Sequence, residues 1–214
     1  HGLPGQSIED ALQDLRTAIS QQPTHLSWYQ LTMEPNTVFW NQPPTLPEDD
    51  TLWDIQEAGQ QLLAEHGYVQ YEVSAYARAG QQARHNLNYW SFGDFIGIGA
   101  GAHGKLSSPN GQIVRTWKTR LPKDYLAPDK AFLAGQRVLT SEELPFEFLM
   151  NVLRLNDGCS SALFTQRTGL PLSVLSSARG EAEARGLLLR DPSRLAASRE
   201  GQLFLNDLLQ HFLA

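Results

Sequence analysis

The segment from Arg84 to Gly104, RHNLNYWSFGDFIGIGAGAHG, constrains the fold and the chemistry of this chain more than any other segment. A His-Asn pair and a Tyr-Trp pair precede a short apolar run that leads into closely spaced glycines. Glycine has no Cβ, so such a run lets the backbone turn sharply or approach a ligand closely. An imidazole beside two aromatic rings suits a flat, conjugated or iron-containing ligand. The segment therefore predicts a ligand site beside a tight backbone turn.

The composition is that of a globular protein with one or two domains. The chain has 214 residues, of which 41% are hydrophobic, and five are tryptophans, enough to build a core. The net charge of −6 argues against binding along a nucleic-acid backbone, which needs a basic face. No apolar run reaches the roughly 20 residues that span a bilayer, and no signal peptide opens the chain. We expect a soluble, cytoplasmic protein without a transmembrane segment.

The chain begins with a loop that leads into a helix. HGLPGQS is rich in Gly and Pro, and Ser7 with Asp10 forms a variant of the capping box ahead of a helix over Ile8–Ile19. A loop of this kind usually follows a strand in a βα unit. We therefore expect the chain to be a fragment cut inside a larger domain.

Helices and strands alternate over the next part of the sequence. Leu26–Thr32 reads as a strand, with Glu34 just after its end, and Tyr68–Ser74 reads as another. Between them a long Pro-rich loop leads to a helix that starts near Glu48 and closes at His66-Gly67. The order helix, strand, helix, strand predicts parallel βα units.

A short apolar run and a hairpin follow. Phe95–Ala100 is consistent with a buried strand, with His103 among the glycines at its C-terminal end. Lys105–Thr119 predicts a β-hairpin around Pro109-Asn110-Gly111 because Asn-Gly is a strong turn signal. The pattern weakens over 122–139, and we place a domain boundary near Leu139–Glu143, with domains over 1–139 and 140–214.

The last part of the chain predicts a winged-helix-like unit of three helices, a small strand pair and a closing helix. The ranges are Pro145–Leu155, Ser160–Thr168, Leu172–Arg185, then Leu187–Arg190 paired with Arg194–Ala197, and finally Arg199–Leu213. Such a unit raises the alternative of DNA binding. From Ser141 onward, however, seven Lys and Arg face nine Asp and Glu, a net charge of −2. Because groove-reading helices need a positive face, we expect no nucleic-acid partner.

Each candidate site residue has a structural alternative. His85 could bind iron with Asn86, Tyr89 and Trp90 around it, or Asn86 could cap a short helix whose aromatic residues pack in the core. Gly99 and Gly101 could cradle a nucleotide-like ligand beside His103, or serve a tight turn. Glu34 could orient a polar ligand or accept hydrogen bonds from loop amides. Cys159 is the single cysteine, which excludes an internal disulfide and a cysteine-cluster metal site.

Four segments in this order resemble one family: HGLPGQS, LSWYQLTMEPNT at Leu26–Thr37, RHNLNYW at Arg84–Trp90 and FIGIGAGAHG at Phe95–Gly104. The family is the radical SAM proteins related to oxygen-independent coproporphyrinogen III oxidase, and HNLNYW is similar to its heme-chaperone branch. The resemblance implies an α/β fold: the last βα units of a partial (β/α)6 radical SAM barrel, followed by a C-terminal winged-helix-like, mainly helical domain.

The resemblance also implies cofactors and partners. Members bind a [4Fe-4S] cluster through a CxxxCxxC loop, completed by S-adenosylmethionine, and this chain has no such loop and no Fe-S ligands, so alone it should be inactive as an enzyme. Thr32 and His103 match late S-adenosylmethionine contacts, with Gly99 and Gly101 in the same expected cofactor site. In the chaperone branch His85 would be the heme-iron ligand, with Asn86, Tyr89 and Trp90 around the heme. The expected partners are heme and hemoprotein acceptors of the respiratory chain, some of them membrane-associated. The alternative is the oxidase of porphyrin biosynthesis.

Overall fold

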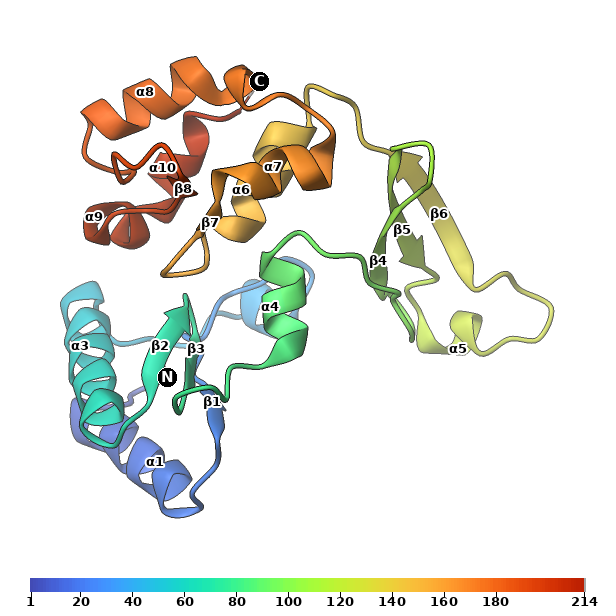
Figure 1. The fold of residues 1–214 in the computed structure, drawn as a ribbon. Coiled ribbons are helices and arrows are strands. Elements are labelled where there is room, and N and C mark those ends of the chain that lie inside the picture. The colour runs from blue at the N-terminus through green and yellow to red at the C-terminus, as the bar shows by residue number, and fades with distance from the viewer. Residues whose placement is uncertain (214) are drawn as a thin grey trace. The chain divides into compact units, whose positions relative to one another are not determined.

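A computed structural model of the chain describes residues 1–213, and it contains two compact units, His1–Ala83 and a second that begins at Arg84 (Figure 1). Each unit has its own hydrophobic core. The domain boundary predicted at 139/140 is a different division of the chain and stays a prediction. Among residues 1–213, no helix combines the length and hydropathy that crossing a bilayer requires.

The first unit packs two helices with a small sheet. α1 and α3 lie side by side, and the sheet order is β1-β3-β2. The central contacts of the core join Leu15 of α1 and Leu63 of α3 to Tyr68 and Tyr76. The elements are α1 (Ile8–Ser20), β1 (His25–Ser27), α2 (Val38–Asn41), α3 (Asp49–Glu65), β2 (Val69–Glu72) and β3 (Ala75–Ala77).

The two helices predicted in this unit are confirmed as α1 and α3, including the reciprocal Ser7–Asp10 capping box of α1, whereas α2 forms inside the segment predicted as a long loop. The parallel pairing of the strands is wrong. β3 lies between β1 and β2 and runs antiparallel to both, because the chain turns back directly after Glu72 to form a hairpin. β1 also ends at Ser27 rather than Thr32, so Glu34 lies in an irregular, exposed segment and not at the end of a strand.

The second unit contains a three-stranded antiparallel sheet of order β4-β5-β6. Its strands are β4 (His103–Ser107), β5 (Ile113–Lys118) and β6 (Leu133–Val138), with the short helix α5 (Pro122–Tyr125) between β5 and β6. The predicted hairpin is confirmed: β4 and β5 pair on either side of the Asn110-Gly111 turn, where Gly111 has φ of 84°. Strand β6 was not predicted, because the sequence pattern in its range is weak. It forms because it pairs antiparallel with β5.

The buried strand predicted at Phe95–Ala100 is wrong. Only Phe95 pairs, in an isolated bridge to Lys105, and Ile96 and Ile98 are 73% and 85% exposed. This apolar run therefore forms an exposed loop, and its hydrophobic character does not indicate burial.

The C-terminal part of the second unit is helical around a core that includes Phe148, Leu149 and Phe164. The predicted strand pair is reduced to one bridge, Leu188 to Ala197, and β8 pairs with β7 instead. The single closing helix is wrong in detail, because Phe204 leaves helical geometry and divides it in two. The elements are α6 (Leu144–Val152), β7 (Cys159–Ser160), α7 (Ser161–Thr168), the 3₁₀ helix η1 (Leu172–Leu175), α8 (Ser176–Ala184), β8 (Arg194–Leu195), α9 (Arg199–Leu203) and α10 (Leu205–Gln210).

Candidate functional site

The HNLNYW segment forms a short helix, α4 (Arg84–Trp90), at the start of the second unit (Figure 1). His85 and Tyr89 are one helical turn apart, and their ring centroids are 5.1 Å apart. The Tyr89 ring in turn stacks on Phe95 at 3.9 Å with an interplanar angle of 25°. Because His85 is exposed, the arrangement presents an accessible imidazole beside two stacked rings.

Tyr89 keeps its proton more firmly than a free tyrosine. Partial burial raises the pKa of its hydroxyl, and the nearby Arg115 guanidinium only partly opposes this. The ring therefore stays neutral at physiological pH and acts as an aromatic surface.

Trp90 joins α4 to the helical part of the same unit. The guanidinium of Arg154, which follows α6, lies 4.5 Å from the Trp90 ring centroid in a cation–π contact. Within residues 1–213, neither Trp90 Nε1 nor Arg154 Nε has a hydrogen-bond partner, although both atoms are buried. The cation–π contact therefore holds this pair together.

The chain leaves α4 through a buried left-handed turn. Phe92 has φ of 54°, a rare backbone conformation for a side chain of this size, and it packs edge-on against Phe148 at 5.5 Å. Asn88 supports the turn because its side-chain amide donates to the Asp94 carbonyl at 2.9 Å. The end of α4 is thus held by contacts within its own segment and with α6.

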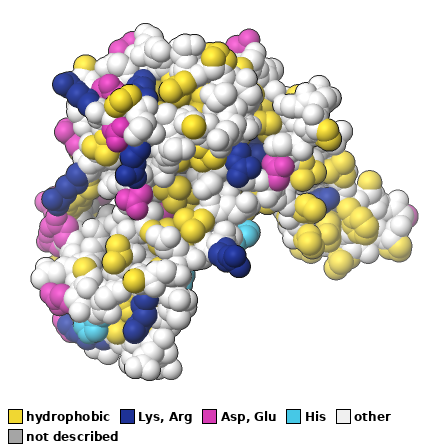
Figure 2. Space-filling view, viewed as in Figure 1, with side chains coloured by type: hydrophobic (Ala, Val, Ile, Leu, Met, Phe, Trp, Pro, Cys, Tyr) yellow, Lys and Arg dark blue, Asp and Glu magenta, His cyan; other side chains and the backbone are white. Residues whose placement is uncertain are grey.

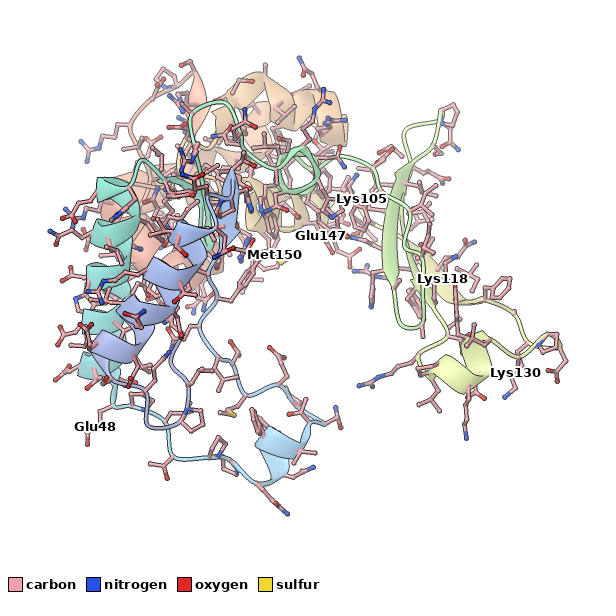
Figure 3. All side chains as sticks on the ribbon, turned by 90° about the horizontal axis from the view of Figure 1, so that it is seen from below. Glu48, Lys105, Lys118, Lys130, Glu147 and Met150 are labelled. Atoms are coloured by element: carbon pink, nitrogen blue, oxygen red, sulfur yellow. The ribbon has the colours of Figure 1, made fainter. Side chains whose placement is uncertain are left out.

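An ion pair between a buried lysine and a partly exposed aspartate connects this turn to β4. Lys105 is 1% exposed; its Nζ donates to Asp94 Oδ1 at 2.8 Å and lies 4.2 Å from the centroid of the Phe92 ring. The Ser107 amide and hydroxyl also donate to Asp94, at 2.9 Å each. Figure 3 shows Lys105 at the junction between the sheet and the helical part of this unit.

These contacts shift both titrations. Burial disfavours ionisation of Asp94, but the hydrogen bonds from Lys105 and Ser107 outweigh it, so the pKa of Asp94 lies below its ordinary value. Burial lowers the pKa of Lys105, and Asp94 opposes that shift only in part.

The glycine segment forms a turn that is held by hydrogen bonds to other residues of this chain. Gly99 and Gly101 have φ of 109° and 70°, a region that L side chains rarely adopt. The Gly99 amide donates to Tyr125 Oη at 3.1 Å, and the Gly101 amide donates to the Thr119 carbonyl at 2.9 Å. A ligand contact by either glycine stays a prediction.

The two predicted S-adenosylmethionine contacts lie in different units. His103 is exposed and is the first residue of β4, paired with Trp117, so its predicted place at the C-terminal end of a strand is wrong. Thr32 is exposed in the irregular segment after β1, where its hydroxyl donates to the Gln30 carbonyl at 3.4 Å.

Sequence reasoning brought His85, Asn86, Tyr89 and Trp90 together, and the structure places all four on one helix. It missed the residues that hold that helix, namely Phe95, Asp94, Lys105 and Arg154. Phe95 was obscured because its apolar neighbours suggest a strand, and Arg154 carries no local signal because its contact spans 64 positions of sequence.

No metal-binding cluster of three or more His, Cys, Asp or Glu side chains is found within residues 1–213. Cys159 is largely enclosed, and burial raises the pKa of its thiol to about 12, so the thiolate that a metal or cluster requires is disfavoured.

Residues 139–204 match the HemN C-terminal domain family. This part of the chain is similar to the HemN C-terminal domain. Over its full length the chain is 52% identical to the protein named heme chaperone HemW from Escherichia coli (strain K12) and 49% identical to that from Haemophilus influenzae. It covers 56% and 55% of those two proteins, so it spans about half the length of the curated relatives it matches, corresponding to their C-terminal part.

The fold agrees with this relationship. The solved structure of coproporphyrinogen III oxidase (HemN) from Escherichia coli, described as a radical SAM enzyme, superimposes with a TM-score of 0.74 over 99% of this chain and 53% of that one. Sequence identity is 16%, so this likeness shows the fold alone. The fold class is confirmed: this chain has the α/β fold of the matching portion of that solved structure, and residues 139–204 match the HemN C-terminal domain family.

Proposed function

We propose that this protein is a heme chaperone of the radical SAM type, which binds heme at α4 and delivers it to hemoproteins of the respiratory chain. One observation carries the proposal: His85 presents an exposed imidazole 5.1 Å from the Tyr89 ring, which is itself stacked on Phe95. The names of the relatives support the same function.

The residues at α4 fit a heme group. Histidine imidazole is a common ligand of heme iron, so the ring nitrogen of His85 would donate its electron pair to the iron when heme is bound. Tyr89 and Phe95 offer a rigid apolar surface to a planar ring, and Trp90 is fixed by Arg154. Asn86 lies on the same helix as a further polar contact.

In the intact protein, we propose that S-adenosylmethionine and a [4Fe-4S] cluster are also bound. Thr32 and His103 are the residues of this chain assigned to S-adenosylmethionine, with Gly99 and Gly101 in the turn before His103. Cys159 alone cannot supply the three thiolates of a cluster loop. We expect no cluster to form on this chain after reconstitution with iron and sulfide.

The second candidate is oxidation of coproporphyrinogen III by the intact protein, which the fold match to HemN favours. An assay of the full-length protein with S-adenosylmethionine separates the two: formation of protoporphyrinogen supports the oxidase. Its absence, with heme still bound, supports the chaperone.

Hemin titration tests the site directly, followed by the Soret band. If His85 is the iron ligand, His85→Ala weakens binding by at least about tenfold, the smallest loss typical of disturbing a metal site. The matched control is His66→Ala, which removes another exposed histidine, at the end of α3. Equal binding by all three proteins would contradict the assignment of His85, and no binding by the unmodified chain would contradict heme binding at α4.

A further inference from the structure

The guanidinium of Arg154 is held in place beside α4. It lies 4.5 Å from the centroid of the Trp90 ring, and its Nε is buried. Within residues 1–213, the Arg154 side chain forms no ion pair and donates no hydrogen bond. A guanidinium carries five N–H donors and stays charged throughout the physiological pH range, so this group lacks an acceptor.

Two other cations near α4 have carboxylate partners. Lys105 pairs with Asp94 at 2.8 Å, and Arg115, whose charge acts on α4, pairs with Glu147 at 2.5 Å. On the face of this unit in view in Figure 2, basic side chains of the helical part likewise lie close to acidic ones. Arg154 differs from this pattern, because an aromatic ring holds it and no carboxylate of the described residues neutralises it.

Arg154 lies at the end of a row of contacts that begins at His85. The ring centroids of His85 and Tyr89 are 5.1 Å apart, and those of Tyr89 and Trp90 are 6.1 Å apart. Trp90, the last residue of α4, in turn contacts the guanidinium. A ligand whose centre lies at His85 and whose edge extends along this row therefore brings that edge toward a positive charge.

We propose that Arg154 binds a propionate carboxylate of heme and so sets the orientation in which α4 takes up the ring. Heme carries two propionates on one edge of a planar macrocycle, and this proposal rests on the proposed function of α4. The planar fork of a guanidinium matches the two oxygens of a carboxylate, and such charge-assisted bonds are stronger than neutral ones. Because Trp90 already holds the guanidinium, little side-chain freedom is lost on binding.

Arg84 is a second candidate for this role, because it directly precedes His85 in the sequence. Its side chain is exposed, and no ring or carboxylate among the residues that the structure describes holds it. An unrestrained arginine loses more conformational entropy when it binds, so the geometry favours Arg154.

Titration of the full chain with hemin and with hemin dimethyl ester, in the same co-solvent and followed by the Soret band, tests the proposal. The two probes share the iron and the ring, but the ester has no carboxylate. We expect the unmodified chain to bind hemin at least about tenfold more tightly than the ester, the loss that removing one hydrogen bond to a charged group typically causes. Equal affinities would overturn the proposal and leave heme binding at α4 standing. Binding of neither probe would overturn the proposed function as well.

Variants separate a carboxylate contact from a structural role, and circular dichroism checks that each is folded. Arg154→Gln should lower the affinity for hemin about tenfold and leave that for the ester unchanged. Arg154→Lys keeps a cation beside Trp90 without the fork, so it should retain part of the preference for hemin. Arg199→Gln, at an exposed position of α9, is the matched control and should keep the full preference.

Two results with these variants would overturn the proposal. An equal loss of affinity for both probes in Arg154→Gln and in Arg154→Lys would show that Arg154 only supports Trp90. Loss of the preference in Arg84→Gln, with the preference kept in Arg154→Gln, would assign the carboxylate contact to Arg84.

Discussion

At the scale of single residues, the buried Lys105 shows what a sequence pattern leaves out. The hairpin that contains it was predictable from the Asn110-Gly111 turn, but nothing local distinguishes Lys105 from an exposed hairpin lysine. Its burial depends on Asp94, eleven positions earlier, and on the Phe92 ring. The contact between His85 and Tyr89 was predictable because the two residues are one helical turn apart in the sequence.

We predict that the two halves of the Asp94–Lys105 pair respond unequally to substitution. Asp94→Asn should lower the free energy of unfolding by about 2–4 kcal/mol, because it leaves a buried cation without its carboxylate. Lys105→Met should cost less, because a flexible apolar side chain fills the same space and the Asp94 side chain, 40% exposed, can be hydrated. Denaturant titration measures both, and a greater loss from Lys105→Met would contradict this account.

The same pair predicts a dependence on pH. The pKa of Asp94 is lower in the folded state, so its contribution is present above the ordinary aspartate value near 3.8 and is lost as pH falls through the folded-state pKa. As the pH falls below about 4, the free energy of unfolding should therefore decrease less in Asp94→Asn than in the unmodified chain. Asp129→Asn, at an exposed aspartate, is the control. It should lose as much unfolding free energy on acidification as the unmodified chain does.

At the scale of helices and strands, elements with strong periodicity and caps were predictable and pairings were not. α1 follows from its Ser7 cap and its apolar spacing. The antiparallel insertion of β3 between β1 and β2 did not follow, because three residues carry no period that reveals a partner. The apolar run that contains Ile96 and Ile98 gave the opposite error. It predicted a buried strand, but both side chains are exposed.

Gly59 of α3 gives a test at this scale. An ideal Cβ on Gly59 would lie 2.0 Å from the Trp28 ring, whereas a Cβ on Gly180 of α8 would meet nothing within 4 Å. Gly59→Ala should therefore lower the free energy of unfolding by about 1–3 kcal/mol despite the better helix propensity of alanine. Gly180→Ala should raise it by about 0.5–1 kcal/mol. Thermal unfolding of both variants checks the sign, and stabilisation by Gly59→Ala would show that Trp28 can move aside.

At the scale of the whole molecule, the fold class was predictable from the resemblance of four ordered segments. The contacts between the sheet and the helical part of the second unit were not, and only the structure shows them. In the second unit, Glu147 of α6 accepts hydrogen bonds from Arg115 at 2.5 Å and from Arg137 at 3.5 Å, and so links two strands of the sheet to the helical part. Figure 3 labels Glu147 between the sheet and the helices. No sequence period connects residues so far apart.

We predict that Glu147→Gln loosens this link. Removing the charge leaves the half-buried Arg115 guanidinium without its carboxylate, which should cost about 2 kcal/mol of unfolding free energy. Hydrogen exchange should accelerate in β5 and β6. Glu57→Gln, at an exposed position of α3, should change neither quantity, and an unchanged exchange rate in Glu147→Gln would show that β5 and β6 are held without it.

The left-handed turn after α4 has a consequence for the order of folding. Tyr89 meets Phe95, and Asn88 meets Asp94, across only six positions of chain, and Asp94 meets Lys105 across eleven. Contacts this local close small loops, whose entropic cost is low, so they form faster than contacts between distant segments. The aromatic surface of α4 can thus assemble early in folding, before Arg154 arrives from the helical part to fix Trp90.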